Sequence, residues 1–411
     1  MKDKNLWVVF LSLGTMFFMI STTIEVTWLK LLIISISVLQ YILALIFAAK
    51  DYSNKKQNNT TGVQSFPPPP PPTFNYEHQT INFIKMKHLE RALQGRNGIG
   101  RYLLMFVSIF FIAQLAAIPV LFMLIPIIKN GGSFSDITSA IENPTAFGVS
   151  ANFYLAVMMS TFVLLYFAFS LLIKPIHQRT VRETINGRKH IRWNRIWTGM
   201  IVWGIFVIID TVISLLISGP YNFEFRFNAS AFLPMLLIIL VLMPFQTSIE
   251  EILMRGYLAQ GVGKWTRSRW WALIIPSVIF ALLHAANPEV KEFGFWLAMP
   301  QYLIMGLMLG LVSILDDGIE LALGIHFINN ALAAMLVTHD ASAFQTDALF
   351  KLKELNPVAS LISISIACVL VVLVLQRIYK WNFNVLNKKL ELLPPPVPPM
   401  QTEVTEPVQH V

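Results

Sequence analysis

Ten stretches of this sequence are apolar over a length that equals or approaches the thickness of a lipid bilayer. A helix needs about 20 mostly apolar residues to span the hydrocarbon core. A transmembrane barrel would instead show alternating strands of about ten residues, whereas these runs are continuous and longer. The sequence therefore predicts an all-α, polytopic transmembrane bundle of about ten helices. The predicted segments are Leu6–Thr22, Leu31–Ala49, Tyr102–Ile128, Asn152–Ile173, Thr198–Ser218, Ala231–Gly256, Trp271–Ala286, Leu297–Leu315, Leu321–Thr338 and Val358–Leu375.

The charged residues support a membrane protein and indicate its orientation. Only 13% of the residues are charged, whereas an average soluble domain has about 25%. With the N-terminus in the cytoplasm, 24 of the 31 Lys and Arg residues fall in loops on the cytoplasmic side and six on the other side. This positive-inside pattern predicts that both termini are cytoplasmic. The net charge of +8 thus indicates topology and an affinity for anionic lipid, and we expect no nucleic-acid partner.

Composition divides the chain into four parts. Residues 1–50 hold two apolar runs without a small-residue cleavage site, which predicts an uncleaved N-terminal transmembrane hairpin. Residues 51–100 are a Pro-rich cytoplasmic linker, whose end, Ile81–Leu93, is typical of a basic amphipathic helix on the membrane surface. Residues 101–380 form an eight-helix membrane-embedded body, and residues 381–411 predict a disordered Pro-rich tail.

Isolated residues inside the apolar runs need a separate interpretation. Cys368, the one cysteine, supports no intramolecular disulfide, metal cluster or thiol protease, and we interpret it as a small residue facing lipid or the core. Asp210 lies where an ionisable side chain is costly, so it either faces a polar partner or has a functional role. Gly306 and Gly310 are spaced for a close helix contact, which suits any helical bundle.

Two adjacent carboxylates and an arginine end the sixth apolar run. Glu251 and Arg255 are four residues apart, so they share one face of a helix and can pair. Glu250 is rotated by about 100° from that face. One carboxylate would then be structural, and the other would be available for proton chemistry. The structural alternative is a charge cluster that merely ends a transmembrane span.

Further polar residues occur in the next apolar runs. His284 ends the stretch that begins at Phe280, and His326 and Asn330 are spaced to project from one helix face. Each histidine alone is more often a core residue, but several intramembrane groups of this type must all be sheltered from lipid. A turn near Thr266–Arg267 would place Glu250 and His284 at similar depth. His326 matches that depth only if its helix starts recessed in the protein.

These three elements, in this order, resemble the motifs of the CPBP family, the CAAX proteases and bacteriocin-processing enzymes. That family includes the type II CAAX prenyl endopeptidases and the Abi proteins. Its EExxxR motif matches Glu250, Glu251 and Arg255. Its FxxxH motif matches Phe280 and His284, and its HxxxN motif matches His326 and Asn330. The resemblance covers residues 230–340, the motif core, whereas the N-terminal hairpin and the linker depart from the family pattern.

The resemblance implies a membrane-embedded endopeptidase. Carried onto this sequence, Glu250 would activate water and His284 would help to position it. His326 and Asn330 would stabilise the developing oxyanion, while Glu251 and Arg255 would organise the site. A desolvated carboxylate and preorganised donors suit such chemistry. Two histidines and a glutamate, namely Glu250, His284 and His326, could also bind zinc, but the HExxH spacing of soluble zinc proteases is absent, and we favour a metal-free mechanism.

Two other functions are consistent with the same fold. The chain could be a catalytically silent membrane scaffold or toxin-resistance (immunity) protein, or a transporter with a Glu/His proton relay. A transporter would favour internally repeated halves, and none is evident. For an enzyme, we expect a peptide or a membrane protein as substrate, with prenylation an open alternative. The short loops favour the bacterial cytoplasmic membrane.

Overall fold

The computed structural model describes residues 87–390, apart from residue 117 and residues 120–147. The predicted N-terminal hairpin, most of the linker, the end of the third apolar run and the last 21 residues (391–411) therefore lie outside the described residues. Each of the eight runs predicted after residue 101 contains one long helix. These helices are α3 (Ile99–Ala116), α7 (Ala151–His177), α9 (Trp193–Asn222), α10 (Ala229–Glu251), α12 (Arg269–Leu283), α14 (Phe295–Leu315), α15 (Glu320–Leu336) and α16 (Pro357–Tyr379).

The described part of the chain is an all-α transmembrane bundle, as predicted. Six of its helices are long and apolar enough to cross a membrane, and α12 and α15 are shorter apolar helices. Large aliphatic side chains point outward, and Leu216 and Ile217 on α9 are 79% and 80% exposed. In water such a surface would be unfavourable, whereas lipid accepts it without cost. The chain is therefore an integral membrane protein.

Sequence-encoded caps begin several of these helices. Asn228 accepts a hydrogen bond from the backbone of Ser230 at the start of α10. Ser268 does the same for α12, and Asn356 precedes a proline that starts α16. Such side chains satisfy backbone N–H groups that the first turn of a helix leaves unpaired. In a membrane protein this matters more, because no water replaces a missing partner inside the bilayer.

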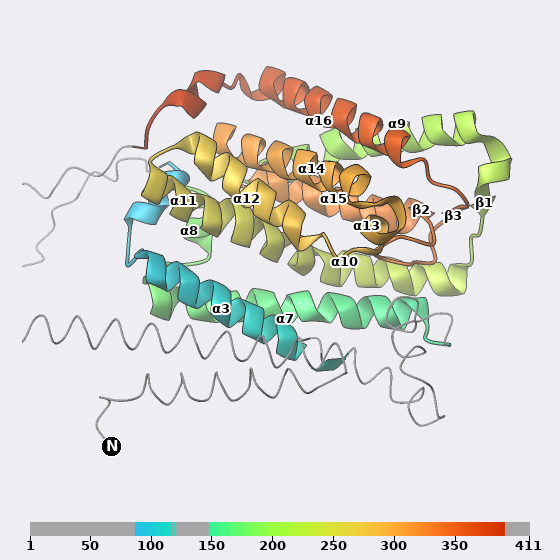
Figure 1. The fold of residues 1–411 in the computed structure, drawn as a ribbon, viewed down its shortest axis with the longest axis horizontal. Coiled ribbons are helices and arrows are strands. Elements are labelled where there is room, and N and C mark those ends of the chain that lie inside the picture. The colour runs from blue at the N-terminus through green and yellow to red at the C-terminus, as the bar shows by residue number, and fades with distance from the viewer. Residues whose placement is uncertain (1–86, 117, 120–147, 391–411) are drawn as a thin grey trace, which may run out of the picture.

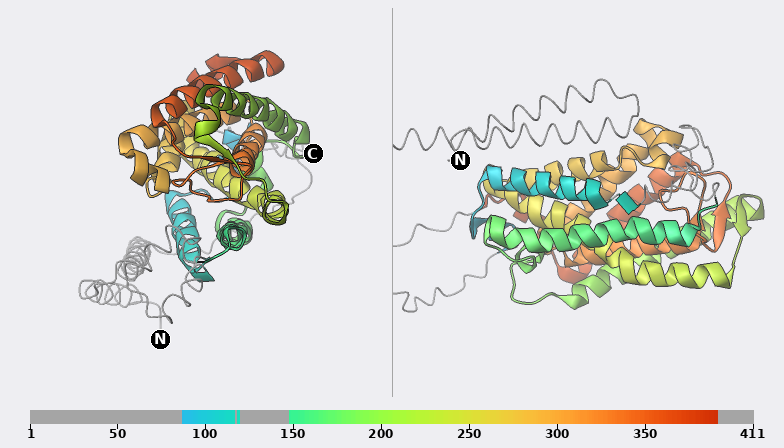
Figure 2. Two further views of the ribbon diagram at one scale, coloured as in Figure 1. Left: turned by 90° about the vertical axis from the view of Figure 1, so that its right-hand side faces the viewer. Right: turned by 90° about the horizontal axis from the view of Figure 1, so that it is seen from below.

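Helix α15 lies at the centre of the bundle (Figure 1). It packs against α9, α10 and α14, while α3 and α7 cover the far side of α10 and α16 covers α14. The end-on view in Figure 2 shows α9 and α16 on one side of α15, and α7 and α3 on the other. Short elements complete one end of the bundle. They are α8 (Arg182–Ile185), α11 (Ala259–Thr266), η2 (Leu89–Leu93) and η5 (Phe383–Asn387), the last two being 3₁₀ helices.

A small sheet at the opposite end of the bundle departs from the purely helical prediction (Figure 1). Strand β3 (Phe350–Leu352) pairs with β1 (Phe223–Phe225) in antiparallel and with β2 (Val337–Thr338) in parallel. The strands follow the ends of α9 and α15, so they tie the loops between helices together. Short loop segments of this kind carry too few residues for a periodic pattern to predict them.

Two predictions at the edges of the body need correction. Residues 381–390 do not belong to a disordered tail, because Trp381, Leu386 and Leu390 are buried and η5 packs on α12 and α14. The described end of Ile81–Leu93 does not lie free on a membrane surface. Leu89 and Ala92 are buried, and η2 packs on α11. In both cases apolar side chains within polar segments find a binding surface on the bundle that their own sequence does not reveal.

The isolated residues behave as structural groups. Cys368 is buried in the apolar core shared by α14, α15 and α16, as expected for a small core residue. Asp210 accepts a hydrogen bond from Ser363, which lies on α16, so it has a polar partner within the apolar surroundings. The Gly306 and Gly310 contact is confirmed, since a Cβ on either residue would press on α12 at Ser277 or Leu273.

The tight contact between α9 and α15 generates a stability prediction. A Cβ on Gly324 would collide with the backbone carbonyl of Ile196. We therefore expect Gly324→Ala to lower the free energy of unfolding by about 1–3 kcal/mol, as overpacking does. Gly100→Ala is the matched control, since no heavy atom lies within 4 Å of its added Cβ. Thermal unfolding in detergent, followed by circular dichroism, would contradict this view of the contact if both variants unfolded together.

Candidate functional site

One long helical segment carries the first motif. Helix α10 ends at Glu251 and continues without a break through η4, a π-helical turn at Ile252–Leu258, into α11. The combined segment, Ala229–Thr266, is 38 residues long. Glu250 and Glu251 lie in the last turn of α10, just before the π turn, and Arg255 lies in the π turn. Short π segments within α-helices are rare and frequently occur at functional sites.

Glu251 is the completely buried carboxylate of the site. One of its oxygens, Oε1, accepts hydrogen bonds from Arg255 Nη1 at 2.9 Å and from His326 Nδ1 at 2.8 Å. The predicted pairing of Glu251 with Arg255 is therefore confirmed. Arg255 also donates to the carbonyl of Gly306 and lies over the ring of Phe280 at 4.2 Å. A buried ion pair is tolerated only when further contacts of this kind compensate for lost hydration.

Glu250 has a different environment from its neighbour. Its Oε1 accepts a hydrogen bond from Gln246 Nε2 at 2.7 Å. Its Oε2 has no hydrogen-bond partner among the described residues and lies 3.7 Å from His326 Nε2. The Glu250 side chain is 20% exposed, whereas that of Glu251 is fully buried. Oε2 of Glu251 also has no hydrogen-bond partner among the described residues, so the two carboxylates differ in exposure and in partners: Glu251 is buried against Arg255 and His326, and Glu250 is partly exposed beside Gln246.

The hydrogen bonds also determine the state of the two histidines. His326 Nδ1 faces the acceptor-only Glu251, so Nδ1 carries a proton and Nε2 is the nitrogen that faces Glu250. His284 Nδ1 lies 2.7 Å from the carbonyl of Phe280 and must donate to it. The remaining nitrogen of His284, Nε2, is therefore left for other partners.

His284 lies beside the hydrogen-bonded network rather than within it. In the described part of the chain it makes no hydrogen bond to Glu250 or His326. The ring of Phe280 connects them, with its centroid 4.6 Å from that of His284 and 6.0 Å from that of His326. On its other face His284 stacks on Tyr302 at 4.4 Å.

Asn330 reaches Glu250 through Gln246. Its amide nitrogen donates to Gln246 Oε1 at 3.1 Å, and Gln246 in turn donates to Glu250. The structure therefore brings Glu250, Glu251, Arg255, His326 and Asn330 into one network, and places His284 against it.

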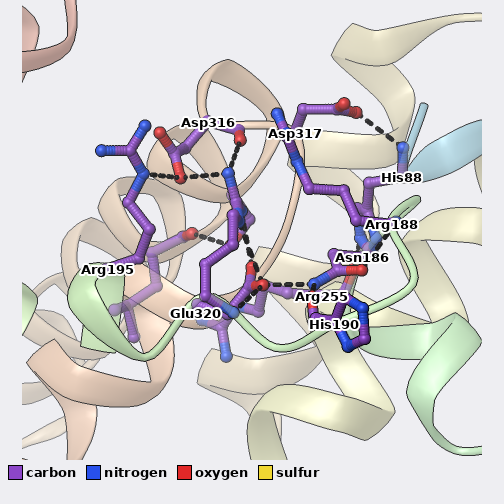
Figure 3. Close-up of polar contacts among 12 residues, drawn as sticks. His88, Asn186, Arg188, His190, Arg195, Arg255, Asp316, Asp317 and Glu320 are labelled. Carbon is purple, nitrogen blue, oxygen red and sulfur yellow. Dashed lines mark hydrogen bonds and ion pairs between the residues drawn. The ribbon is translucent and has the colours of Figure 1, made fainter. Parts of the chain in front are cut away.

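The depth of His326 follows from the way α15 begins. Glu320, its first residue, is fully buried and receives a two-point contact from Arg192, with Nε 3.0 Å from Oε1 and Nη2 2.5 Å from Oε2. Asn186 also donates to Glu320, and Asp316 pairs with both Arg192 and Arg195 (Figure 3). Helix α15 thus starts inside the protein beneath a polar cap, which is the recessed start that the sequence required.

The segment that follows the linker also contacts the site helix. His88 Nε2 lies 3.0 Å from the backbone carbonyl of Arg255, in the π turn (Figure 3). A carbonyl can only accept, so Nε2 carries the proton. Burial lowers the pKa of His88, which keeps its ring neutral. Asp317 accepts from the backbone N–H of His88 at 2.6 Å and fastens the same segment.

The residues of the alternative zinc site do not form a ligand set as they lie. Within residues 87–390, as far as these are described, no three His, Cys, Asp or Glu side chains are grouped so that they could hold a metal ion. A zinc site needs three protein ligands at about 2.0–2.3 Å from one point. Binding zinc through Glu250, His284 and His326 would therefore require these side chains to move.

Comparison with known proteins finds a family that this region resembles. Residues 229–332 match the family model described as Rce1-like, type II CAAX prenyl endopeptidase. Residues 229–332 are thus similar to the Rce1-like family, and we call them the Rce1-like region. The resemblance expected from the three motifs is confirmed, and all the motif residues lie inside the Rce1-like region. The match supports a function of the kind performed by CAAX-type intramembrane proteases.

One relative extends the similarity beyond the Rce1-like region. The uncharacterized protein YyaK of Bacillus subtilis (strain 168) is 29% identical over 274 residues, which cover 66% of this chain and 89% of YyaK. No solved structure matches the chain.

Several residues around the Rce1-like motifs had no predicted role. Gln246 holds Glu250 and Asn330, Asn329 donates to Asn330 at 3.0 Å, and Tyr302 stacks on His284. The spacing of Gln246, four residues before Glu250 on one helix face, was the signal that could have identified it. Tyr302 carries no such signal, because it reaches the site from a separate helix.

Because Glu251 is buried with Arg255 whereas Glu250 is partly exposed, we expect substitutions at these two places to change stability by different amounts. Arg255→Met leaves the charge of Glu251 buried without its cation, so we expect the free energy of unfolding to fall by about 3–5 kcal/mol. Glu250→Gln preserves shape and can still pair with Gln246, so we expect it to stay within about 1 kcal/mol of the wild type. Chemical denaturation in detergent measures both values. Equal losses would show that Glu250 is as structural as Glu251.

Proposed function

We propose that this protein is an intramembrane endopeptidase that hydrolyses a peptide bond near the membrane surface with a water molecule activated by Glu250. The observation that carries the proposal is the free oxygen of Glu250. It lies 3.7 Å from His326 Nε2, in the part of the bundle that also holds Asn330 and His284. A water placed beside this gap could bond both groups. Glu251 and Arg255 would keep the arrangement rigid.

In the proposed reaction Glu250 acts on the water, while Asn330 and His326 act on the carbonyl oxygen of the substrate. Glu250 takes a proton from the water through Oε2, and the water oxygen attacks the carbonyl carbon of the scissile bond. His284, through Nε2, helps to position the water. The negative charge on the carbonyl oxygen meets the amide N–H of Asn330 and the Nε2–H of His326, whose ring carries a proton on both nitrogens in this step, and such preorganised donors stabilise a tetrahedral intermediate strongly. Glu250 then returns the proton to the leaving nitrogen, which breaks the peptide bond.

The substrate would be a peptide or a membrane protein whose cleavage site reaches into the bundle. The Rce1-like match brings in a prenylated C-terminus as one form of that substrate. A prenyl chain would enter through lipid, beside the apolar surfaces of the helices. We place the protein in a bacterial cytoplasmic membrane with both termini in the cytoplasm, because the basic loops gather at the end of the bundle that holds α8 and α11.

Cleavage assays test this proposal directly. Purified protein is incubated with quenched fluorescent peptides, with and without a prenylated C-terminal cysteine. We expect Glu250→Gln to lower kcat by about 10²–10⁴-fold, the usual contribution of a general base. His284→Ala and Asn330→Ala should also lose activity. Gln301→Met is the matched control, since the hydrogen bond that Gln301 makes among the described residues is to its own helix, at Leu297. Unchanged cleavage by Glu250→Gln would overturn the site.

Metal chelation separates the alternatives that remain. A metal-free glutamate enzyme keeps its activity after treatment with a chelator. Loss of activity with restoration by zinc would assign Glu250, His284 and His326 to ligand roles. If the wild type cleaves no peptide or membrane-protein substrate, the chain is better explained as a scaffold or toxin-resistance protein of the same fold.

Accessibility of single cysteines tests the orientation. In a Cys368→Ala background, we expect Glu224→Cys, in β1, to react with a membrane-impermeant maleimide in intact cells. Arg188→Cys, at the basic end of the bundle, should react only after the membrane is opened. Both positions are exposed in the protein. The opposite labelling pattern would invert the topology.

A further inference from the structure

Three side-chain amides connect Glu250 to helix α9. The indole Nε1 of Trp203 donates to Asn329 Oδ1 at 3.0 Å. Asn329 Nδ2 donates to Asn330 Oδ1 at 3.0 Å, Asn330 Nδ2 donates to Gln246 Oε1 at 3.1 Å, and Gln246 Nε2 donates to Glu250 Oε1 at 2.7 Å. The chain of hydrogen bonds joins α9, α15 and α10.

The two ends of this chain determine the direction of every link. An indole can only donate, so the oxygen of Asn329 must face Trp203. An ionised carboxylate can only accept, so the nitrogen of Gln246 must face Glu250. Each amide between them then has one possible orientation, with oxygen toward Trp203 and nitrogen toward Glu250. Trp203 is only 2% exposed and lies in the apolar core of α14, α15 and α16, which anchors the donor end.

We propose that Gln246, Asn329 and Trp203 are positioning residues that orient the Asn330 amide and the Glu250 carboxylate for the reaction. This inference rests on the proposed function and adds residues that the three motifs do not contain. The oxygen of Asn330 is occupied by Asn329, so its NH₂ group faces the site. One N–H bonds to Gln246, and the other is left to donate to the oxyanion. If Asn330 turned over, it would present an oxygen to a negatively charged oxygen, which is repulsive.

The row of hydrogen bonds from Trp203 through Asn329, Asn330 and Gln246 to Glu250 is called the relay below. Substitutions that keep the size of a side chain but remove its hydrogen bonds test it. Asn329→Asp can accept from Trp203 but cannot donate to Asn330. Gln246→Met keeps the volume but removes both links to Glu250 and Asn330. For each variant we expect kcat to fall on the order of 10- to 100-fold, the range for losing a hydrogen bond linked to a charged group, with little change in KM because the loss is in the transition state. Gln301→Met, the matched control, should behave as the wild type.

A double-mutant cycle distinguishes a relay from separate structural effects. Trp203→Phe keeps the aromatic ring and removes the donor, so it should lower kcat in the wild-type background. In a Gln246→Met background the relay is already cut, so Trp203→Phe should cause no further loss. Fully additive losses would overturn the relay.

The indole itself provides a measurement that does not depend on cleavage. With ¹⁵N-labelled tryptophan, the Nε1–H resonance of Trp203 is assigned by its loss in Trp203→Phe. We expect this resonance to shift in Gln246→Met, three hydrogen bonds away, and to stay unchanged in Gln301→Met. A resonance that ignores Gln246→Met would overturn the relay even if Glu250 proves catalytic. If the resonance shifts but the protein cleaves nothing, the proposed function fails and the relay stands as an orienting network.

Discussion

The architecture of the site depends on one buried charge, the carboxylate of Glu251. It has no contact with solvent, and the guanidinium of Arg255 and the imidazole of His326 share one of its oxygens. An uncompensated charge at this depth would cost several kcal/mol, so α15 and the π turn of the site helix must stay together. Glu250 lies outside the Glu251–Arg255 pair: it accepts a hydrogen bond from Gln246, and its Oε2 has no hydrogen-bond partner among the described residues. Helical rotation thus gives two adjacent glutamates different surroundings.

A second polar cluster sets the height of α15 in the bundle. Arg192 grips the buried Glu320 at two points, and Asp316 receives both Arg192 and Arg195. Burial raises the pKa of Asp316, which shows that its two arginines only partly offset the loss of hydration. Through this cap, the basic loop before α9 has a structural role. It supports the helix that carries His326 and Asn330.

Much of this arrangement could be predicted from sequence, and the reasons for the exceptions are physical. Apolar runs revealed the eight described long helices, and four-residue spacing revealed the Glu251–Arg255 pair, because both patterns repeat along one helix. His326 could lie at the depth of Glu250 only if α15 started inside the protein. The contact of Arg192 with the buried Glu320 provides this start. Contacts between distant segments left no such pattern. The packing of Leu390 on the bundle, the small sheet and the stacking of Tyr302 on His284 arise only when separate helices meet.

The π turn at Ile252–Leu258 changes the direction in which side chains point before and after it on the long site helix. One additional residue in a turn rotates everything that follows by about 100° relative to a regular helix. Upstream of the turn, Glu250 faces the site. Downstream, Tyr257 meets His177 at 2.6 Å, and Gln260 reaches the backbone of His88. The helix therefore presents two faces in different phases, one toward the motif residues and one toward the end of the bundle that holds α8 and α11. Deleting one residue within the turn would rotate the downstream face by about 100° relative to the face that carries Glu250, without removing either face's side chains.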